Sequence, residues 1–138
     1  MNEDLKNIIK SFYSEIINKG NLSIINTIMS ESFIDHNIPP EAPNGIEGFI
    51  QFLRMVSTAF PDIQVTVQEL IAENNMVVSR LSITGTQTGI LMGKIAPTNK
   101  KAVWTGIDIF KIENGKITDR WSQRDLLSMM KQIGAIPQ

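Results

Sequence analysis

The sequence predicts an α+β domain in which N-terminal helices pack on one face of a curled, mostly antiparallel sheet. Two observations support this fold class. Apolar residues recur at spacings of three and four in the first part of the chain, and from residue 63 onward they alternate with polar residues. Helices followed by a run of consecutive strands are typical of α+β proteins. A curled sheet of four or more strands, with helices on its concave side, forms a cone whose open end is a natural pocket.

Length and composition fit one globular domain over residues 1–138. The chain has 13 basic and 14 acidic residues and no basic run, so we expect no nucleic-acid partner. It has no cysteine, which excludes disulfides and thiolate metal sites and suits a reducing cytoplasm. The N-terminus does not resemble a signal peptide, and no apolar run reaches the ~18 residues of a membrane span. We therefore expect a cytoplasmic protein without a membrane partner.

Two helices are predicted before residue 30. Residues 3–19 place their apolar side chains on one face, with Asn2 as a capping residue and Gly20 at the stop. A shorter helix is predicted over residues 22–29. Together the two helices form a hairpin that can cover a sheet.

A proline-rich segment separates these helices from a third. Residues 31–43 contain three prolines in five positions, which excludes a helix or a central strand, and they hold the only histidine, His36. Asn44-Gly-Ile-Glu47 matches a capping box at the start of the third helix, which ends at Pro61. We expect the segment 31–43 to be a loop beside the pocket.

The rest of the chain predicts four strands and a closing helix. The strands are expected over residues 63–71, 76–86, 102–112 and 115–125, and the helix over residues 126–133. Asn114-Gly115 is typical of a tight hairpin turn, because both residues of a type I′ turn have positive φ angles.

The last predicted strand offers the best candidate for a pocket wall. Ile117, Asp119, Trp121, Gln123 and Asp125 alternate along it, so a regular pleat places them on one face. An indole ring followed by a carboxamide and an acid is an unusual composition for a core. This face is therefore expected to line a small-molecule pocket.

Several motifs resemble, in order and spacing, those of the SnoaL-like polyketide cyclase (ester cyclase) family. They are Asp35-His36, Gly45 with Phe49, Ala59-Phe-Pro-Asp62, Gly85-Thr86 with Gly89, Asn114-Gly-Lys-Ile117, and Trp121 with Asp125. The resemblance implies the cone fold of the nuclear transport factor two-like superfamily and a cofactor-free intramolecular aldol ring closure. It also implies an acid/base catalyst at the end of the last strand, which is Asp125 in this sequence. Members often carry a histidine on the preceding strand, where this sequence has Asp108.

Three roles for Asp125 fit the sequence. It can act as a base whose pKa is raised by the apolar wall of Trp121, or it can cap the last helix. It can also pair with Arg80, which becomes a buried cation if its side of the strand faces inward. Such a pair would lower the pKa of Asp125 and make it a weaker base. Arg80 otherwise lies on a solvated strand face or binds the substrate.

The other candidate site residues come from separate segments. His36 has the right pKa for proton transfer, although a lone histidine in a polar loop is commonly a hydrogen-bonding residue. His36, Asp108 or Gln123 can stabilise an oxyanion. Phe49 and Trp104 are further candidates for the substrate-binding surface. One histidine among scattered acids falls short of a metal ligand set, so no metal or other cofactor is expected.

Two functions from different classes are consistent with the sequence. The first is cofactor-independent acid/base catalysis on a small hydrophobic or carbonyl compound, as an aldol-type cyclisation or an isomerisation. The second is a non-catalytic module of the same fold that binds a hydrophobic ligand or mediates association. An outer sheet face rich in valine, isoleucine and leucine, together with the resemblance, predicts a homodimer formed sheet to sheet.

Overall fold

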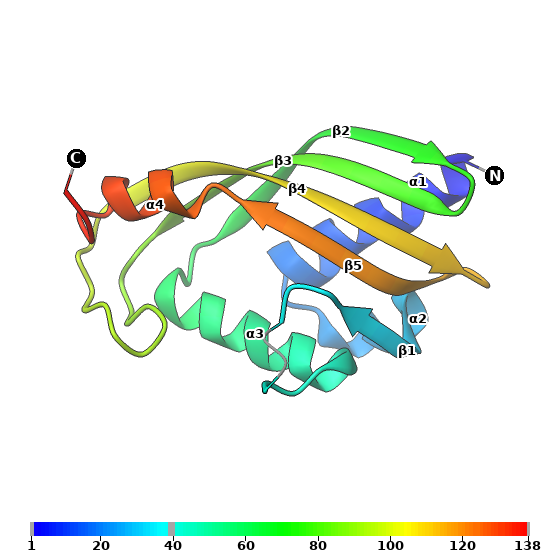
Figure 1. The fold of residues 1–138 in the computed structure, drawn as a ribbon, viewed down its shortest axis with the longest axis horizontal. Helices are drawn as coiled ribbons and strands as arrows, with labels where there is room; N and C mark the ends of the chain where they lie inside the picture. The colour runs from blue at the N-terminus through cyan, green and yellow to red at the C-terminus, as the bar shows by residue number, and fades with distance from the viewer. Residues whose placement is uncertain (1, 39–40, 138) are drawn as a thin grey trace.

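A five-stranded sheet forms one layer of the domain, and helices cover one of its faces (Figure 1). The computed structural model describes residues 2–38 and 41–137. The strand order is β1-β5-β4-β3-β2, in which β1 is parallel to β5 and the other neighbours are antiparallel. The elements are α1 (Asn2–Ser11), η1 (Phe12–Asn18), η2 (Leu22–Ile24), α2 (Ile25–Ile28), β1 (Met29–Asp35), α3 (Gly45–Ala59), β2 (Gln64–Glu73), β3 (Met76–Thr86), β4 (Lys101–Glu113), β5 (Lys116–Arg124) and α4 (Leu126–Gln132). The predicted α+β cone fold is therefore confirmed.

The predicted N-terminal helix is present, but its second half is wound differently. Helix α1 continues directly into η1, which is a π-helix, and Gly20 follows with a φ angle of 68°. Asn2 belongs to the first turn of α1 and does not precede it. The predicted helix over residues 22–29 is a short 3₁₀ turn followed by α2. None of the helices in the described part of the chain is long and apolar enough to cross a membrane.

Strand β1 corrects the first part, residues 31–35, of the loop predicted over residues 31–43. Residues 36–38 and 41–43 lie outside helices and strands, as predicted, and residues 39–40 lie outside the described part of the chain. Strand β1 runs parallel to β5 at the edge of the sheet, with an irregular register between Met29 and Ile34. In the sequence, the prolines come after this strand, so they do not remove its hydrogen-bond donors. The apolar pattern is short and interrupted by serine and glutamate, which explains why the strand was missed.

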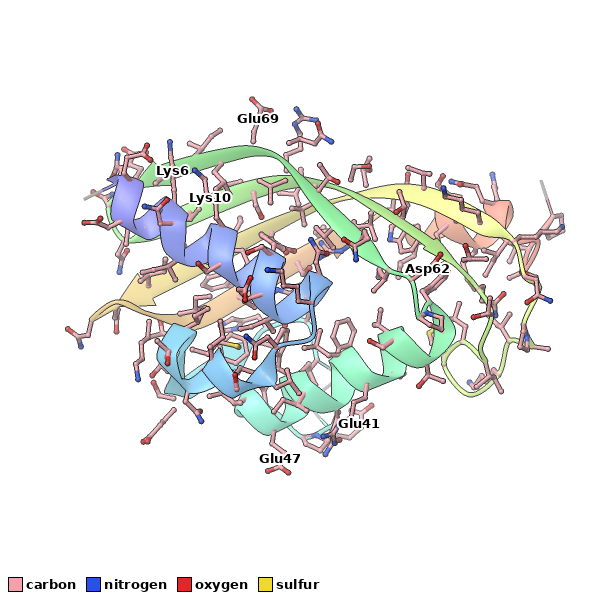
Figure 2. The ribbon with its side chains drawn as sticks, turned by 180° about the vertical axis from the view of Figure 1, so that it is seen from behind. Lys6, Lys10, Glu41, Glu47, Asp62 and Glu69 are labelled. Carbon is pink, nitrogen blue, oxygen red and sulfur yellow. The ribbon has the colours of Figure 1, made fainter. Side chains whose placement is uncertain are left out.

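Asn44 caps α3, as predicted, but its side chain also holds β1. Its Oδ1 accepts hydrogen bonds from the backbone N–H groups of Gly45 at 2.7 Å and Asp35 at 3.0 Å, and its Nδ2 donates to the Asp35 carbonyl oxygen. Figure 2 shows Glu47 pointing outward from α3, so the reciprocal half of a capping box is not formed. The start of α3 is thereby fixed to the end of β1.

A β-bulge in β5 corrects the predicted face of that strand. Ile112 pairs with Ile117, whereas its neighbour Lys111 pairs with Asp119, so one extra residue lies between them in β5. The extra residue reverses the alternation of side chains. Ile117 is buried under the helices, whereas Trp121 lies on the opposite face and is 37% exposed.

The core lies between the helices and the inner face of the sheet. Phe12 of η1 is at its centre, with ring centroids 5.2 Å from Phe110 of β4 and 5.6 Å from Phe49 of α3. Phe33 of β1 packs on Phe49 at 5.9 Å. These rings connect two helical segments and two strands, so they join the layers that Figure 2 shows from the helical side.

Phe110→Ala tests whether this aromatic cluster supports the domain. Phe110 is fully buried, so we expect the free energy of unfolding to fall by about 3–5 kcal/mol. The matched control is Phe52→Ala on α3, where the ring is 39% exposed and the loss should stay below about 1.5 kcal/mol. Urea unfolding measures both variants, and equal losses would contradict this account of the core.

Candidate functional site

A polar cluster is buried on the inner face of the sheet, under the helices. Ser79 of β3 is the direct strand partner of Asp108 of β4, and Asp108 is the direct partner of Ser122 of β5. Arg120 and Arg124 flank Ser122 on the same side of β5. After the bulge, these alternate residues point to the inner face of the sheet. Three adjacent strands thus bring hydroxyl, carboxylate and guanidinium groups to one place.

Asp108 is the centre of this cluster and accepts hydrogen bonds on both oxygens. Oδ1 accepts from Ser122 Oγ at 2.5 Å and from Arg124 Nη1 at 2.7 Å. Oδ2 accepts from the Tyr13 hydroxyl at 2.5 Å, from Arg124 Nη2 at 3.2 Å and from Arg120 Nη2 at 3.4 Å. Burial raises the pKa of Asp108, but the charge of Arg120 and then the contacts of Arg124 and Ser122 outweigh it and hold the pKa at about 2. The carboxylate is therefore ionised at neutral pH.

Tyr13 joins the helical layer to this carboxylate. Its hydroxyl lies 2.6 Å from Ser79 Oγ in addition to its bond with Asp108. Burial raises the pKa of Tyr13 well above its ordinary value, and the negative charge of Asp108 raises it further. The phenol therefore stays protonated and acts as a donor to Asp108.

Arg120 links Asp108 to a second buried carboxylate. Its Nη1 donates to Asp35 Oδ2 at 3.0 Å, and its guanidinium lies 5.8 Å and 5.7 Å from the ring centroids of Phe12 and Phe49. Asp35, Arg120, Asp108 and Arg124 therefore alternate in charge, and we call these four residues the interior charge chain. It carries two negative and two positive charges, which is the pairing that buried ions require.

Three of the candidate residues lie on this inner side. Asp108 is at its centre, and the Phe49 ring packs beside Arg120. Trp104 of β4 is buried further along the sheet, with its ring 5.1 Å from Phe60. The structure thus groups Asp108 and Phe49 and places Trp104 in the same layer.

Other candidates lie on the outer face of the sheet. The imidazole of His36 stacks on the Trp121 ring at 4.5 Å, and its Nε2 lies 2.9 Å from Asp119 Oδ2. His36, Trp121 and Gln123 line a shallow depression of about 200 Å³ whose floor includes Ile107. The predicted wall of Trp121 and Gln123 is therefore part of an open surface.

Asp125 and Arg80 also lie on the outer side, each with a partner of its own. Asp125 Oδ1 accepts a hydrogen bond from the backbone N–H of Ser128 at 3.1 Å, which confirms the helix-cap role. Arg80 Nε donates to Glu69 Oε1 at 2.6 Å on the exposed sheet surface. Both residues, together with Arg124, line a second depression of about 330 Å³. Among the described residues, the Arg80–Asp125 pair that the sequence left open as one alternative is replaced by these two contacts.

Sequence reasoning missed Tyr13, Ser122, Arg120 and Arg124. Ser122, Arg120 and Arg124 occupy alternate positions along β5. Had these positions been predicted to point inward, the three residues would have been identified as candidates. The bulge concealed this orientation. Among the described residues, no group of three or more potential side-chain ligands is arranged to hold a metal ion.

The depressed pKa of Asp108 predicts a loss of stability in acid. Folding lowers the pKa from 3.8 to about 2, so the stabilisation is complete above the unfolded value and is lost as the pH falls towards 2. Between about pH 5 and about pH 2, the free energy of unfolding should fall by roughly 2 kcal/mol more for the wild type than for Asp108→Asn. Urea unfolding across this range measures the difference, and parallel pH profiles would contradict the prediction.

The comparisons with known proteins agree with this architecture. TsrD from Streptomyces laurentii superposes with a TM-score of 0.88 at 26% identity, covering 99% of this chain and 98% of that one. IdmH from Streptomyces antibioticus has a TM-score of 0.82 at 25% identity, with 94% and 98% covered. A SnoaL-like polyketide cyclase from Agrobacterium tumefaciens shares the fold, with a TM-score of 0.77 at 21% identity and 94% and 98% covered.

A comparison with curated proteins gives no match. The sequence profile described as SnoaL-like polyketide cyclase matches residues 7–133, which is nearly the whole chain. The match spans every strand of the sheet and includes Tyr13, Asp108 and Arg124 of the buried cluster. The chain therefore belongs to the SnoaL-like polyketide cyclase family.

Proposed function

We propose that the chain binds a small carbonyl compound on the inner side of the sheet and performs cofactor-independent acid/base chemistry on it. One observation carries this proposal: an ionised carboxylate, Asp108, lies under the helices among hydroxyl and guanidinium donors. A base and groups that stabilise an oxyanion are the two requirements for forming an enolate. Family membership supports an aldol-type cyclisation or an isomerisation as the reaction class.

Each residue of the cluster has a role in this proposal. Asp108 takes the α-proton, so that the C–H bond breaks and its electron pair moves to the carbonyl oxygen. Arg124 stabilises the resulting enolate. At rest Asp108 is a weak base, because a pKa of about 2 is far below neutral pH. A substrate oxyanion that shares the charge of Arg124 would raise this pKa and strengthen the base.

A second function is favoured by the saturation of Asp108. Its two oxygens already accept five hydrogen bonds, as a fixed polar element of the interior would. In that case the domain binds a hydrophobic ligand without chemistry. The two functions differ in whether removing the negative charge of Asp108 abolishes proton transfer.

Asp108→Asn tests the catalytic role. The wild type should accelerate exchange of the α-hydrogens of 1-tetralone in deuterated water, followed by proton NMR. The variant should lose at least about 100-fold of this rate, because general base catalysis typically contributes ~10²–10⁴-fold. Asp108→Glu, which keeps the charge but moves the carboxylate, should also lose most of the rate.

Asp125→Asn is the matched control for this experiment. It should keep the exchange rate and lose about 1 kcal/mol of stability or less, because Asp125 serves as the cap of α4. Circular dichroism confirms that each variant is folded. Full exchange activity in folded Asp108→Asn would exclude the catalytic role and favour the binding module.

We also propose that the outer face of the sheet pairs with a second copy of the chain. Val103 and Ile107 are each 48% exposed on β4, and Trp121 is 37% exposed on the neighbouring β5. The helices α1, α2 and α3 cover the other face (Figure 1). The outer surface also carries Arg80 close to Glu69, so a two-fold arrangement can oppose unlike charges.

Sedimentation velocity at micromolar concentration tests this association. The wild type should sediment as a dimer, and Ile107→Lys should sediment as a monomer, because a charge would be buried in the interface. Met55→Lys is the control, since Met55 is similarly exposed, at 44%, on the helical side. A monomeric wild type would contradict the proposal.

A further inference from the structure

Arg124 uses only one edge of its guanidinium group within the protein. Nη1 and Nη2 donate to the two oxygens of Asp108 at 2.7 Å and 3.2 Å, and Nη1 also donates to the Gln123 carbonyl oxygen at 3.2 Å. An arginine has five N–H donors, arranged in a rigid planar group. The edge formed by Nε and the second hydrogen of Nη2 therefore remains open among the described residues.

Arg124 also reaches the surface, because it lines the depression of about 330 Å³ together with Arg80 and Asp125. In the interior charge chain, the side chains of Asp35, Arg120 and Asp108 are 3%, 5% and 0% exposed, whereas that of Arg124 is 21% exposed. Gly106 of β4 lies under the guanidinium, and a Cβ atom there would come within 2.6 Å of Nη1. The absence of a side chain at Gly106 lets Arg124 lie flat against the strand and reach Asp108.

The other two strand arginines have no such edge. Arg80 Nε is occupied by Glu69 at 2.6 Å. Among the residues that the structure describes, Arg120 Nε has no hydrogen-bond partner, but it is buried, and the rings of Phe12 and Phe49 lie next to its guanidinium. Arg124 thus combines a fixed orientation, a free pair of donors and contact with solvent.

We propose that the open edge of Arg124 binds a carboxylate, so that the ligand of the inner site is a carbonyl compound that also carries a carboxylate group. This inference rests on the proposed location of the site on the inner side of the sheet. Parallel N–H groups of Nε and Nη2 match the two oxygens of a carboxylate and give a bidentate, charge-assisted pair. The interior charge chain is neutral in sum, so its own carboxylates do not impose a net negative charge against an incoming anion.

The same contact would couple binding to the reactivity of Asp108. A ligand carboxylate on Arg124 places a negative charge near Asp108 and weakens the pull of the guanidinium on it. Both effects raise the pKa of Asp108, which otherwise stays at about 2. A carboxylate on the ligand would thereby act as an anchor and also as an activator of the base.

NMR of the arginine Nε–H groups tests the carboxylate site directly. The chain has four arginines, so the spectrum is simple, and Arg124→Lys assigns the resonance of interest. Benzoate is the probe and benzamide is its uncharged counterpart. We expect the Nε–H resonance of Arg124 to move saturably with benzoate and to remain in place with benzamide.

The remaining arginines are internal controls. Arg80 lines the same depression, but its Nε–H is already bound to Glu69, so its resonance should move less than that of Arg124. Arg54 on the exposed surface of α3 reports non-specific binding. Arg124→Lys keeps the charge but loses the fork, and should weaken benzoate binding at least tenfold, measured from the backbone amide shifts near Ser122. An absent Arg124 response, an equal response to benzamide, or equal shifts of Arg54 and Arg124 would overturn the inference.

The two proposals fail separately. If Asp108→Asn still exchanges the α-hydrogens of 1-tetralone, the catalytic function is excluded. A specific response of Arg124 to benzoate would then still support the carboxylate site. Conversely, a wild type that exchanges α-hydrogens through Asp108 but shows no response at Arg124 would overturn only the carboxylate inference.

Discussion

Arg120 is a cation held away from water in the middle of the domain, and the elements around it are arranged to satisfy it. Asp35 at the end of β1 and Asp108 on β4 accept its hydrogen bonds, and the rings of Phe12 and Phe49 lie next to it. A buried guanidinium with one partner removed would be strongly unfavourable. The edge strand β1, the central strands and the helical layer therefore all contact the guanidinium group of Arg120.

The bulge in β5 gives the two faces of the sheet their different characters. One extra residue sends Arg120, Ser122 and Arg124 inward and leaves Trp121 and Gln123 outside. The inner face then holds balanced charges on largely buried side chains. The outer face keeps aromatic and aliphatic groups that suit association. A single local irregularity thus separates the face that carries the buried charges from the face that carries the exposed apolar groups.

The interior charge chain also limits the basicity of Asp108. Two guanidinium groups stabilise the ionised form of Asp108, which is good for the folded state and unfavourable for a base. Of the four residues of the interior charge chain, Arg124 is the one that reaches solvent. A ligand can therefore change the charge near Arg124 without breaking the other ion pairs. In this arrangement Arg120 stabilises the fold, while Arg124 is the residue through which a ligand can change the charge near Asp108.

The sequence by itself determined the order of the helices and of strands β2 to β5, the hairpin turn at Asn114-Gly115 and the family, because these depend on local periodicity and on motifs close together in the chain. It also selected Asp108 and Phe49 as candidates and left a helix cap as one of three roles for Asp125. Only the tertiary structure decided which residues share a face. Strand β1 exists through its pairing with β5, and the inward turn of Arg120 and Arg124 comes from a bulge opposite β4. Both features are set by contacts between distant segments, which a local pattern does not encode.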